Sequence, residues 1–277
     1  MSTLELLTGR NYLSYSALSS YLDCGERFRL ERVMNAPQQK AWWFIGGSAF
    51  HYASEYLDLG EHDSPAEAWA VAWDRAVTEA ELDDYSKVRA GGRVSKEWPN
   101  KENHEWWAAK GPGMVQAYAD WMAERKLEGW QLLDVNGQPA VEVPVQVEFP
   151  DVLVKGFIDR IMVNDAGEVM VIDLKTGSHT PASTLQLGIY ALGAARNIGV
   201  TPTLGSYYMA RSAALSEPRS LLHYTHELVG SWFAKAKHGI EAELFIPHVT
   251  SQCGTCSVAQ YCAAVGGTAV VPGHFAR

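Results

Sequence analysis

The sequence lacks an apolar run long enough to cross a bilayer, so we expect no transmembrane helix. It also lacks a basic stretch followed by an apolar stretch near Met1; we therefore expect no signal peptide and a cytoplasmic protein without membrane partners. Positive charge is scarce, with 23 Lys and Arg against 32 Asp and Glu and a net charge of −9. Such a chain does not coat nucleic acid nonspecifically, and DNA binding would need a local basic groove.

Cysteine is scarce too, because the 277 residues contain only four. Three of them form C-x-x-C-x-x-x-x-x-C at Cys253, Cys256 and Cys262, and the fourth, Cys24, lies far upstream. Disulfides are not expected in a cytosolic protein, so these thiols are candidate metal ligands. Four thiolates suit either zinc or an iron–sulfur cluster, and the spacing alone does not decide between them.

The most informative stretch predicts a β-hairpin. The segments Val154–Val163 and Glu168–Leu174 are rich in β-branched residues, and Asn164–Gly167 between them has the Asn-Asp-x-Gly composition of a tight turn. This hairpin is expected to bring together residues that are distant along the two strands.

Three polar side chains fall at informative places in this hairpin. Asp159 interrupts the first strand, while Asp173 and Lys175 end the second on one face. Each aspartate alone could be an ordinary turn residue. Two carboxylates brought together repel each other, however, and oxygen ligands favour Mg²⁺ or Mn²⁺ between them. A lysine beside that ion can position or deprotonate a water, which is the chemistry of phosphodiester hydrolysis.

The region before the hairpin is predicted to be mainly helical, over residues 14–130. Helices are expected at Ser14–Val33 with a weak point at Gly25, from about Ser48 after Gly46–Gly47, over residues 64–82, and over residues 104–127 with a break at residues 111–113. Strand alternation follows over Trp130–Phe149. After the hairpin we expect a helix at 183–197, a strand at 204–210, an edge strand at 220–224 and a helix at 225–244.

Basic residues gather in two places of the helical region. Arg27 and Arg29 lie on the first helix, and Arg89, Arg93 and Lys96 lie in a loop over residues 84–103 that we expect to be mobile. Both sets are candidate DNA contacts, because phosphate contacts come mainly from Lys and Arg. A solvated helix face and a solvated loop are the alternatives.

Six motifs in this order resemble the RecB-like branch of the PD-(D/E)XK nuclease superfamily, and within it the exonucleases that carry an iron–sulfur cluster, including CRISPR-associated and phage enzymes. The motifs are Cys24, G-x-x-x-H at 47–51, G-x-x-D-R at 156–160, D-x-K at 173–175, Q-x-x-x-Y at 186–190 and the cysteine triplet. The resemblance implies a single α/β nuclease domain over residues 1–277, with a mixed central sheet flanked by helices. Its α/β core would span residues 131–245, and residues 246–277 would close onto Cys24.

The same resemblance assigns roles to residues. Its metal ligands would be His51, Asp159, Asp173 and the Leu174 carbonyl, and its other catalytic residues would be Lys175, Gln186 and Tyr190. Glu142 and Glu55 are weaker candidates, for the site and its surroundings respectively. The four cysteines would hold a structural [4Fe–4S] cluster that joins distant parts of the chain. The chain departs from the family at Gly25, where proline often follows the first cysteine.

We therefore expect an Mg²⁺- or Mn²⁺-dependent DNA exonuclease, with single-stranded DNA or DNA ends as substrate. The resemblance implies partners among recombination or CRISPR-adaptation proteins, in phage recombination or DNA repair. One alternative is a catalytically silent DNA-binding subunit that retains the fold. Another is a zinc protein in which the cysteines stabilise an unrelated helical fold.

Overall fold

The expected β-hairpin is present, with β6 over Val152–Asn164 and β7 over Val169–Lys175. The two strands pair antiparallel, with Arg160 opposite Ile172 and Val163 opposite Val169. Asn164 organises the turn, because its side-chain oxygen accepts hydrogen bonds from the backbone N–H groups of Ala166 and Glu168. The turn chemistry therefore sets the register on which the functional residues depend.

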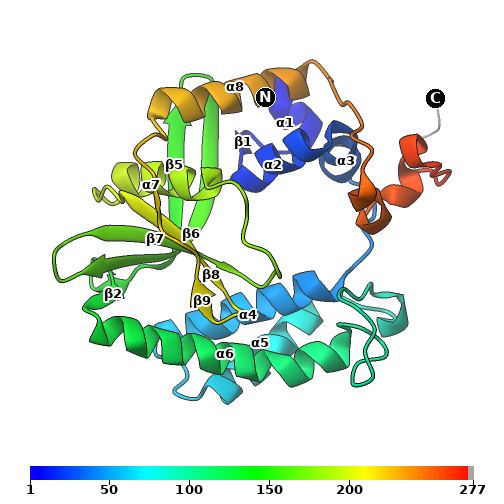
Figure 1. Ribbon diagram of the computed structural model, residues 1–277. Coiled ribbons are helices and arrows are strands. Elements are labelled where there is room, and N and C mark those ends of the chain that lie inside the picture. The colour runs from blue at the N-terminus through cyan, green and yellow to red at the C-terminus, as the bar shows by residue number, and fades with distance from the viewer. Residues whose placement is uncertain (274–277) are drawn as a thin grey trace. The chain divides into compact units, whose positions relative to one another are not determined.

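The computed structural model describes residues 1–273, and its internal contacts define two compact units (Figure 1). The sheet unit comprises Lys40–Val145 and Phe157–His223. The cysteine unit comprises Met1–Gln39, Gln146–Gly156 and the chain from Tyr224. The region expected to be mainly helical, residues 14–130, thus contributes to both units. None of the helices within residues 1–273 combines the length and apolar character needed to span a membrane.

The central sheet is mixed, as expected. In the sheet unit β7 pairs antiparallel with β6 and parallel with β8 (Leu204–Met209), and β8 pairs antiparallel with β9 (Ala214–Leu215) and β10 (Arg219–Ser220). The remaining strands are β2 (Trp130–Leu132), which is antiparallel to β6, then β5 (Val141–Phe149), and the small β3–β4 pair (Asp134–Val135 and Gln138–Pro139). The predicted edge strand at 220–224 is therefore shorter and begins one residue earlier.

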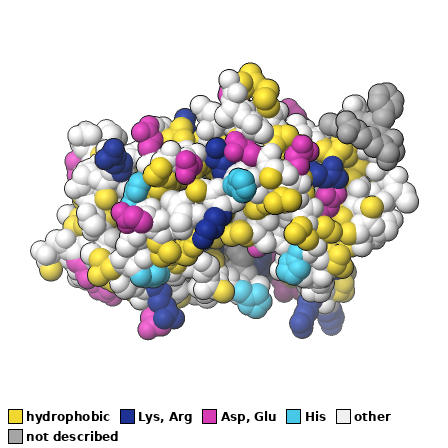
Figure 2. All heavy atoms as spheres, turned by 90° about the horizontal axis from the view of Figure 1, so that it is seen from above, with side chains coloured by type: hydrophobic (Ala, Val, Ile, Leu, Met, Phe, Trp, Pro, Cys, Tyr) yellow, Lys and Arg dark blue, Asp and Glu magenta, His cyan; other side chains and the backbone are white. Residues whose placement is uncertain are grey.

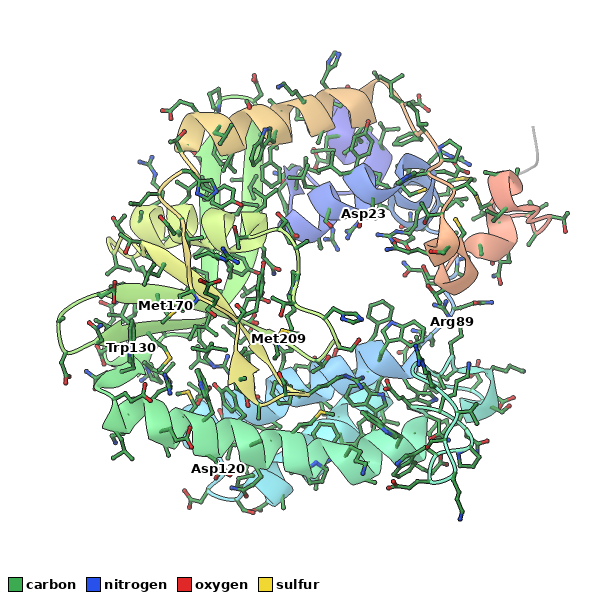
Figure 3. All side chains as sticks on the ribbon, in the orientation of Figure 1. Asp23, Arg89, Asp120, Trp130, Met170 and Met209 are labelled. Atoms are coloured by element: carbon green, nitrogen blue, oxygen red, sulfur yellow. The ribbon has the colours of Figure 1, made fainter. Side chains whose placement is uncertain are left out.

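Helices cover both faces of this sheet. The helices are α4 (Trp42–Asp58), α5 (Pro65–Glu79), α6 (His104–Leu127), α7 (Leu185–Asn197) and the single turn η2 (Tyr85–Lys87). Met170, Ile172 and Leu174 alternate along β7 and pack with α4, α5 and α6 in one buried cluster (Figure 1; Figure 3 labels Met170). Because side chains alternate, Asp173 and Lys175 point to the opposite face, which α7 covers.

Two predicted helix boundaries were wrong. Helix α4 begins at Trp42 rather than near Ser48, so Gly46 and Gly47 lie inside it. A Cβ on Gly46 would come within 2.2 Å of the Trp107 ring, so this glycine lets α4 and α6 approach each other. Helix α6 also runs unbroken through Pro112; Gly111 there makes room for the ring of Trp69. Glycine serves helix packing at both positions instead of ending a helix.

The cysteine unit is built mainly from short helices. They are α1 (Thr3–Thr8), α2 (Tyr15–Asp23), α3 (Gly25–Phe28), the π-helical turn η1 (Arg29–Val33), α8 (His226–Glu241) and the turns η3 (Ser251–Thr255), η4 (Ala259–Tyr261) and η5 (Ala263–Val265). The expected weak point at Gly25 is confirmed, since α2 ends at Asp23 and Cys24 is extended. Strand β1 (Tyr12–Leu13) runs parallel to the start of β6.

Candidate active site

The hairpin brings Asp159 and Asp173 to the same place in the sheet unit. Both carboxylates are buried, with residue exposures of 7% and 1%. Asp159 Oδ2 accepts a hydrogen bond of 2.7 Å from the backbone N–H of Leu174, which fixes its orientation. Lys175 forms an ion pair with Asp173. The two acids and the lysine therefore form one cluster before any ligand binds.

Two further side chains reach this cluster from other elements. His51, from α4, places Nδ1 3.7 Å from Asp159 Oδ2 and 3.7 Å from Glu142 Oε1, from β5. Ligand atoms of these three residues lie within 4.8 Å of one another, and no other trio of His, Cys, Asp and Glu within residues 1–273 does so. From the sequence Glu142 was only a weak candidate for the site, yet its carboxylate lies beside His51.

Glu142 has an unusual backbone conformation. Its φ is +47°, in the left-handed region that non-glycine residues seldom occupy. Its Oε1 atom is buried and accepts no hydrogen bond, although Arg160 Nη1 lies 3.6 Å away. A buried carboxylate oxygen without a donor, held in a strained conformation beside two other ligand atoms, fits a divalent cation.

The electrostatics of the cluster favour an added positive charge. Burial and the neighbouring Asp159 raise the pKa of Asp173 to about 7, against the opposing effects of Lys175 and His51. Burial alone would lower the pKa of His51, but Asp159, Glu142 and Asp173 together hold it above its usual value. The acids thus retain a proton on His51 or Asp173 in the absence of a metal, and a cation would replace that proton.

A buried arginine, Arg160, holds the backbone that carries Asp159 in place. Arg160 is fully buried; its Nε donates to Asp58 Oδ2 at 2.5 Å and to the Tyr118 hydroxyl at 3.1 Å. Its Nη1 donates to the backbone oxygen of Asp159 at 2.6 Å. These bonds hold the strand that carries Asp159 against α4 and α6. The sequence motif included Arg160 but gave it no role, although an arginine among apolar strand residues was a signal that it needs a buried partner.

Lys175 is positioned by the helix that follows it in the chain. Its Nζ donates to Gln186 Oε1 at 3.1 Å, and Gln186 Nε2 donates to the Tyr190 hydroxyl at 2.8 Å. Burial, with the charges of Asp173 and Asp159, raises the pKa of Tyr190, so its hydroxyl stays protonated. Burial and the charge of Glu142 raise the pKa of Glu55.

The four cysteines lie in the cysteine unit. Cys24, Cys253 and Cys256 line one recess of about 290 Å³, and Cys262 packs beside the buried residues Leu30 and Val258. Backbone N–H groups of Arg27 and His248 donate to Cys24 Sγ at 3.5 and 3.4 Å, and that of Thr250 donates to Cys253 Sγ at 3.4 Å. Such donors stabilise a sulfur that carries negative charge.

The candidate DNA contacts occupy varied surroundings. Arg27 lies 3.7 Å from Asp23, and Arg29 makes two bonds of 2.7 Å to Glu26, so both face acidic partners. Arg89 stacks 5.1 Å from the Trp43 ring, whereas Arg93 and Lys96 are exposed. Figure 2 shows Lys and Arg scattered among Asp, Glu and His on the face drawn.

The loop that holds Arg89, Arg93 and Lys96 is anchored rather than loose. Glu102 accepts two hydrogen bonds of 2.8 Å from Arg211, and short bridges join Gly91 to Glu102 and Ala41 to Arg89. The paired guanidinium bonds hold the end of the loop against the strand region that follows Met209. The loop therefore has defined attachments at both ends.

Comparison with known proteins gives the family of this architecture. A family model described as "PD-(D/E)XK nuclease superfamily" matches residues 12–263. The "Gene 69 protein" of Mycobacterium phage D29 is 28% identical over 270 residues, covering 90% of this chain and 95% of that protein. The protein of the same name from Mycobacterium phage L5 is 29% identical over 288 residues, with the same coverage of 90% and 95%. These names state no activity.

A solved structure, "Crystal structure of SSO0001", covers 92% of this chain and 87% of its own. Its TM-score is 0.37 at 15% sequence identity, which is too low to support a shared function.

Proposed function

This chain belongs to the PD-(D/E)XK nuclease superfamily, and we propose that it acts as a metal-dependent deoxyribonuclease that degrades DNA, single strands preferred, from an end. Its mixed sheet flanked by helices is the fold of that superfamily. One observation carries the proposal: Asp159, Asp173 and Lys175 meet at the hairpin, where His51 and Glu142 complete a set of ligand atoms.

The donor set fits a hard divalent cation. His51, Asp159 and Asp173, with the Leu174 carbonyl, would hold Mg²⁺ or Mn²⁺, and Glu142 would add a further oxygen. When bound, such an ion supplies an activated water and neutralises charge on the phosphate. The Oε1 atom of Glu142 is buried and accepts no hydrogen bond, and such an ion would supply the missing partner.

The protein's own side chains position the reactants. Lys175 Nζ, held between Asp173 and Gln186, orients the attacking water. Tyr190 keeps Gln186 in place through its hydroxyl, and therefore acts on Lys175 indirectly. Arg160 fixes the backbone of Asp159, so that the acid meets the substrate in a single orientation.

The cysteines support a [4Fe–4S] cluster with a structural role. The backbone N–H donors at Cys24 and Cys253 suit thiolate sulfur bound to such a cluster.

The test of the nuclease is degradation of end-labelled single-stranded DNA with Mg²⁺ or Mn²⁺. Asp173→Ala and Lys175→Ala are expected to abolish cleavage. Glu168→Gln, an exposed acid in the same hairpin, is the matched control and is expected to cleave as the wild type does. Cleavage that survives both active-site substitutions would contradict the proposed site.

The mode of attack is tested with a circular single strand. An enzyme that needs an end leaves the circle intact while it degrades the linear strand, and the label position gives the polarity. Equal cleavage of the circular and the linear strand would show that the protein is an endonuclease rather than an exonuclease. Binding without cleavage of either, with both metals, would favour the silent DNA-binding subunit, although the retained Lys175 argues against that alternative.

The biological process in which the enzyme acts is also a proposal. Both "Gene 69" relatives are mycobacteriophage proteins, which favours phage recombination or DNA-end processing over CRISPR adaptation. Recombination proteins that bind single strands are then the partners to test first.

A further inference from the structure

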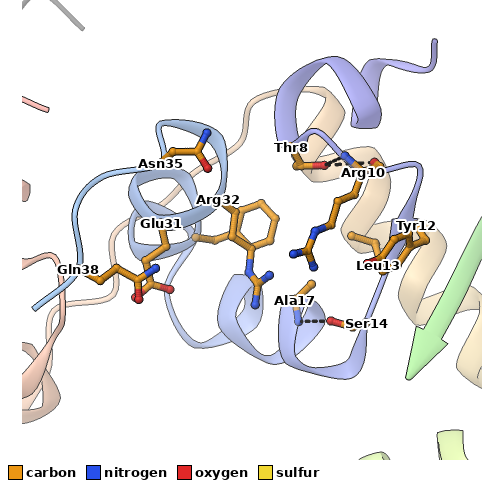
Figure 4. A pocket seen from close by; sticks show the side chains of 11 residues that line it. Thr8, Arg10, Tyr12, Leu13, Ser14, Ala17, Glu31, Arg32, Asn35 and Gln38 are labelled. Carbon is orange, nitrogen blue, oxygen red and sulfur yellow. Dashed lines mark hydrogen bonds between the residues drawn. The ribbon is translucent and has the colours of Figure 1, made fainter. Parts of the chain in front are cut away.

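A recess of about 280 Å³ lies in the cysteine unit between α1, β1, α2 and η1 (Figure 4). Its lining is mostly polar and includes Thr8, Arg10, Tyr12, Ser14, Glu31 and Arg32. The proposed metal site and the cysteines share no lining residue with this recess. Its function is therefore a separate question.

Two guanidinium groups point into the recess from different elements. Arg10 follows α1 and Arg32 lies on the π-helical turn η1, and Figure 4 shows their side chains directed toward the same space. Within residues 1–273 neither arginine lies within 4 Å of a carboxylate oxygen in an ion pair. Two like charges that converge repel each other, and an anion between them would reduce that repulsion.

Arg32 is the more constrained of the two arginines. Its Nε is buried and has no hydrogen-bond partner, and its Nη2 makes only a long contact of 3.4 Å with Ser16 Oγ. Burial first, and the charge of Arg10 second, lower the pKa of the Arg32 guanidinium. An unsatisfied, half-buried guanidinium has planar donors ready for the oxygens of a tetrahedral anion.

The acidic residue in the lining, Glu31, favours the charge of Arg32 but forms no ion pair with either arginine. Glu31 directs Oε1 to the Ser257 hydroxyl at 2.5 Å and Oε2 to Arg27 Nε at 3.9 Å. Its charge is thus shared with residues outside the lining. The backbone of Arg10 is meanwhile held by Thr8, whose hydroxyl donates to the Arg10 oxygen at 3.2 Å. The arginine pair therefore keeps a net positive charge, and the backbone that carries Arg10 is held in place.

From this convergence we propose that the Arg10–Arg32 recess binds a phosphate group of the DNA strand on which the chain acts. That the ligand is DNA rests on the proposed nuclease function. That the bound group is a phosphate rests on the recess alone. A terminal phosphomonoester and an internal phosphodiester share this chemistry. Arg32 supplies the planar donors, and Arg10 closes over the anion from the α1 side.

The test is binding of fluorescent oligothymidylate in EDTA, where cleavage does not occur. Arg32→Gln and Arg10→Gln are expected to weaken binding about ten-fold each, the scale of a charge-assisted hydrogen bond. The slope of log K against log salt should fall by about 0.7, the contribution of one phosphate on a single strand. Lys235→Gln, an exposed cation on α8, is the control that loses the same charge and is expected to bind as the wild type does.

The source of the phosphate is resolved with strands that carry a 5′-phosphate, a 3′-phosphate or neither. A loss confined to one phosphorylated strand assigns the recess to that terminus, and an equal loss on all three assigns it to an internal phosphodiester. Unchanged affinity and salt slope in both arginine variants would overturn the proposal, as would losses no larger than that of Lys235→Gln.

Arg10→Glu separates binding from folding. The new carboxylate would face Arg32 and take the place of the anion, so this variant is expected to unfold at a higher temperature than the wild type while binding the strand worst of all. A merely structural role for the pair predicts that stability and binding change together. If the wild type fails to cleave but binding still depends on both arginines, the nuclease proposal fails and the phosphate site stands. If cleavage occurs and the arginine variants bind normally, the phosphate site alone fails.

Discussion

The acidic cluster of the sheet unit and the cysteine region of the other unit are organised in different ways. The acidic residues sit on paired strands and a long helix, and buried bonds from Arg160 and Leu174 fix them before a ligand arrives. The cysteines sit on one extended residue, Cys24, and on single helical turns. We propose that the fold holds the first site before a metal binds, whereas the second site would need its ligand to hold the fold.

The largest expected effect follows from Asp173→Asn, which tests the first half of this contrast. Removal of a buried ligand is expected to lower the cleavage rate by about 10³-fold or more, comparable to the loss of a preorganised charge in an active site. The unfolding temperature without metal should be unchanged or higher, because the substitution removes a buried charge and its repulsion from Asp159. Rates on end-labelled DNA and thermal unfolding in EDTA measure the two effects.

A marked loss of stability in Asp173→Asn would show instead that the carboxylate holds the fold. Asp165→Asn, in the exposed turn of the same hairpin, is the control for the amide substitution itself.

Cys24→Ala tests the second half of the contrast. The cluster would close a loop from Cys24 to Cys262, and loop-closure entropy for that length contributes about 5 kcal/mol to stability. The variant should lose iron, visible absorbance and the stability of the cysteine unit together. Iron content and thermal unfolding of anaerobically purified protein measure this outcome.

A colourless wild type that contains zinc would favour the zinc alternative for these cysteines. A brown wild type whose Cys24→Ala variant unfolds at the same temperature would remove the structural role and leave the cluster without an assigned function.

Glu142→Gln should lower the affinity for Mn²⁺ by about 10- to 100-fold, because it removes a charged oxygen beside the metal ligands. Glu55→Gln is the matched comparison, since Glu55 lies near Glu142 but outside the trio of ligand atoms, and it should change the affinity only a few-fold. Calorimetric titration of Mn²⁺ measures both. Equal effects of the two substitutions would mean that net charge, rather than the position of Glu142, determines affinity.

The smallest expected effect comes from Gly46→Ala in α4. The added methyl group would meet the Trp107 ring at 2.2 Å, and the overpacking should cost about 1–3 kcal/mol of folding free energy. Gly47→Ala is the control, because its methyl group would meet only the Thr176 hydroxyl, at 3.2 Å, and should change stability by less than about 1 kcal/mol. Denaturant unfolding measures the difference, and equal stabilities would mean that α4 can shift away from α6.

The hairpin could be predicted from the sequence because its information is local. Alternating apolar residues and the Asn-Asp-x-Gly turn determine both the strands and the face on which Asp173 and Lys175 lie. The start of α4 could not, because the role of Gly46 depends on Trp107, which lies 61 positions away in the chain. Intrinsic propensity places glycine at helix ends, and tertiary packing overrode it here.

The candidate site shows the same limit. The positions of His51, Asp159, Asp173 and Lys175 followed from motifs, but the place of Glu142 depends on a backbone conformation with φ of 47° and on contacts between β5 and α4. The partners of Arg160 come from α4 and α6, which no local pattern connects to β6. Motifs therefore indicated the candidate ligands, while the residues that support them emerged only from the fold.

The separation of Cys24 from Cys262 also has a consequence for biosynthesis. At 5–20 residues per second, the ribosome needs roughly 12–48 s to synthesise the chain between them. During that interval Cys24 is a free thiol on a nascent chain, and the segments of the acidic cluster leave the ribosome before the last cysteine does. The order of synthesis thus lets the acidic site fold first, and the proposed cluster would be inserted only after the last cysteine has left the ribosome.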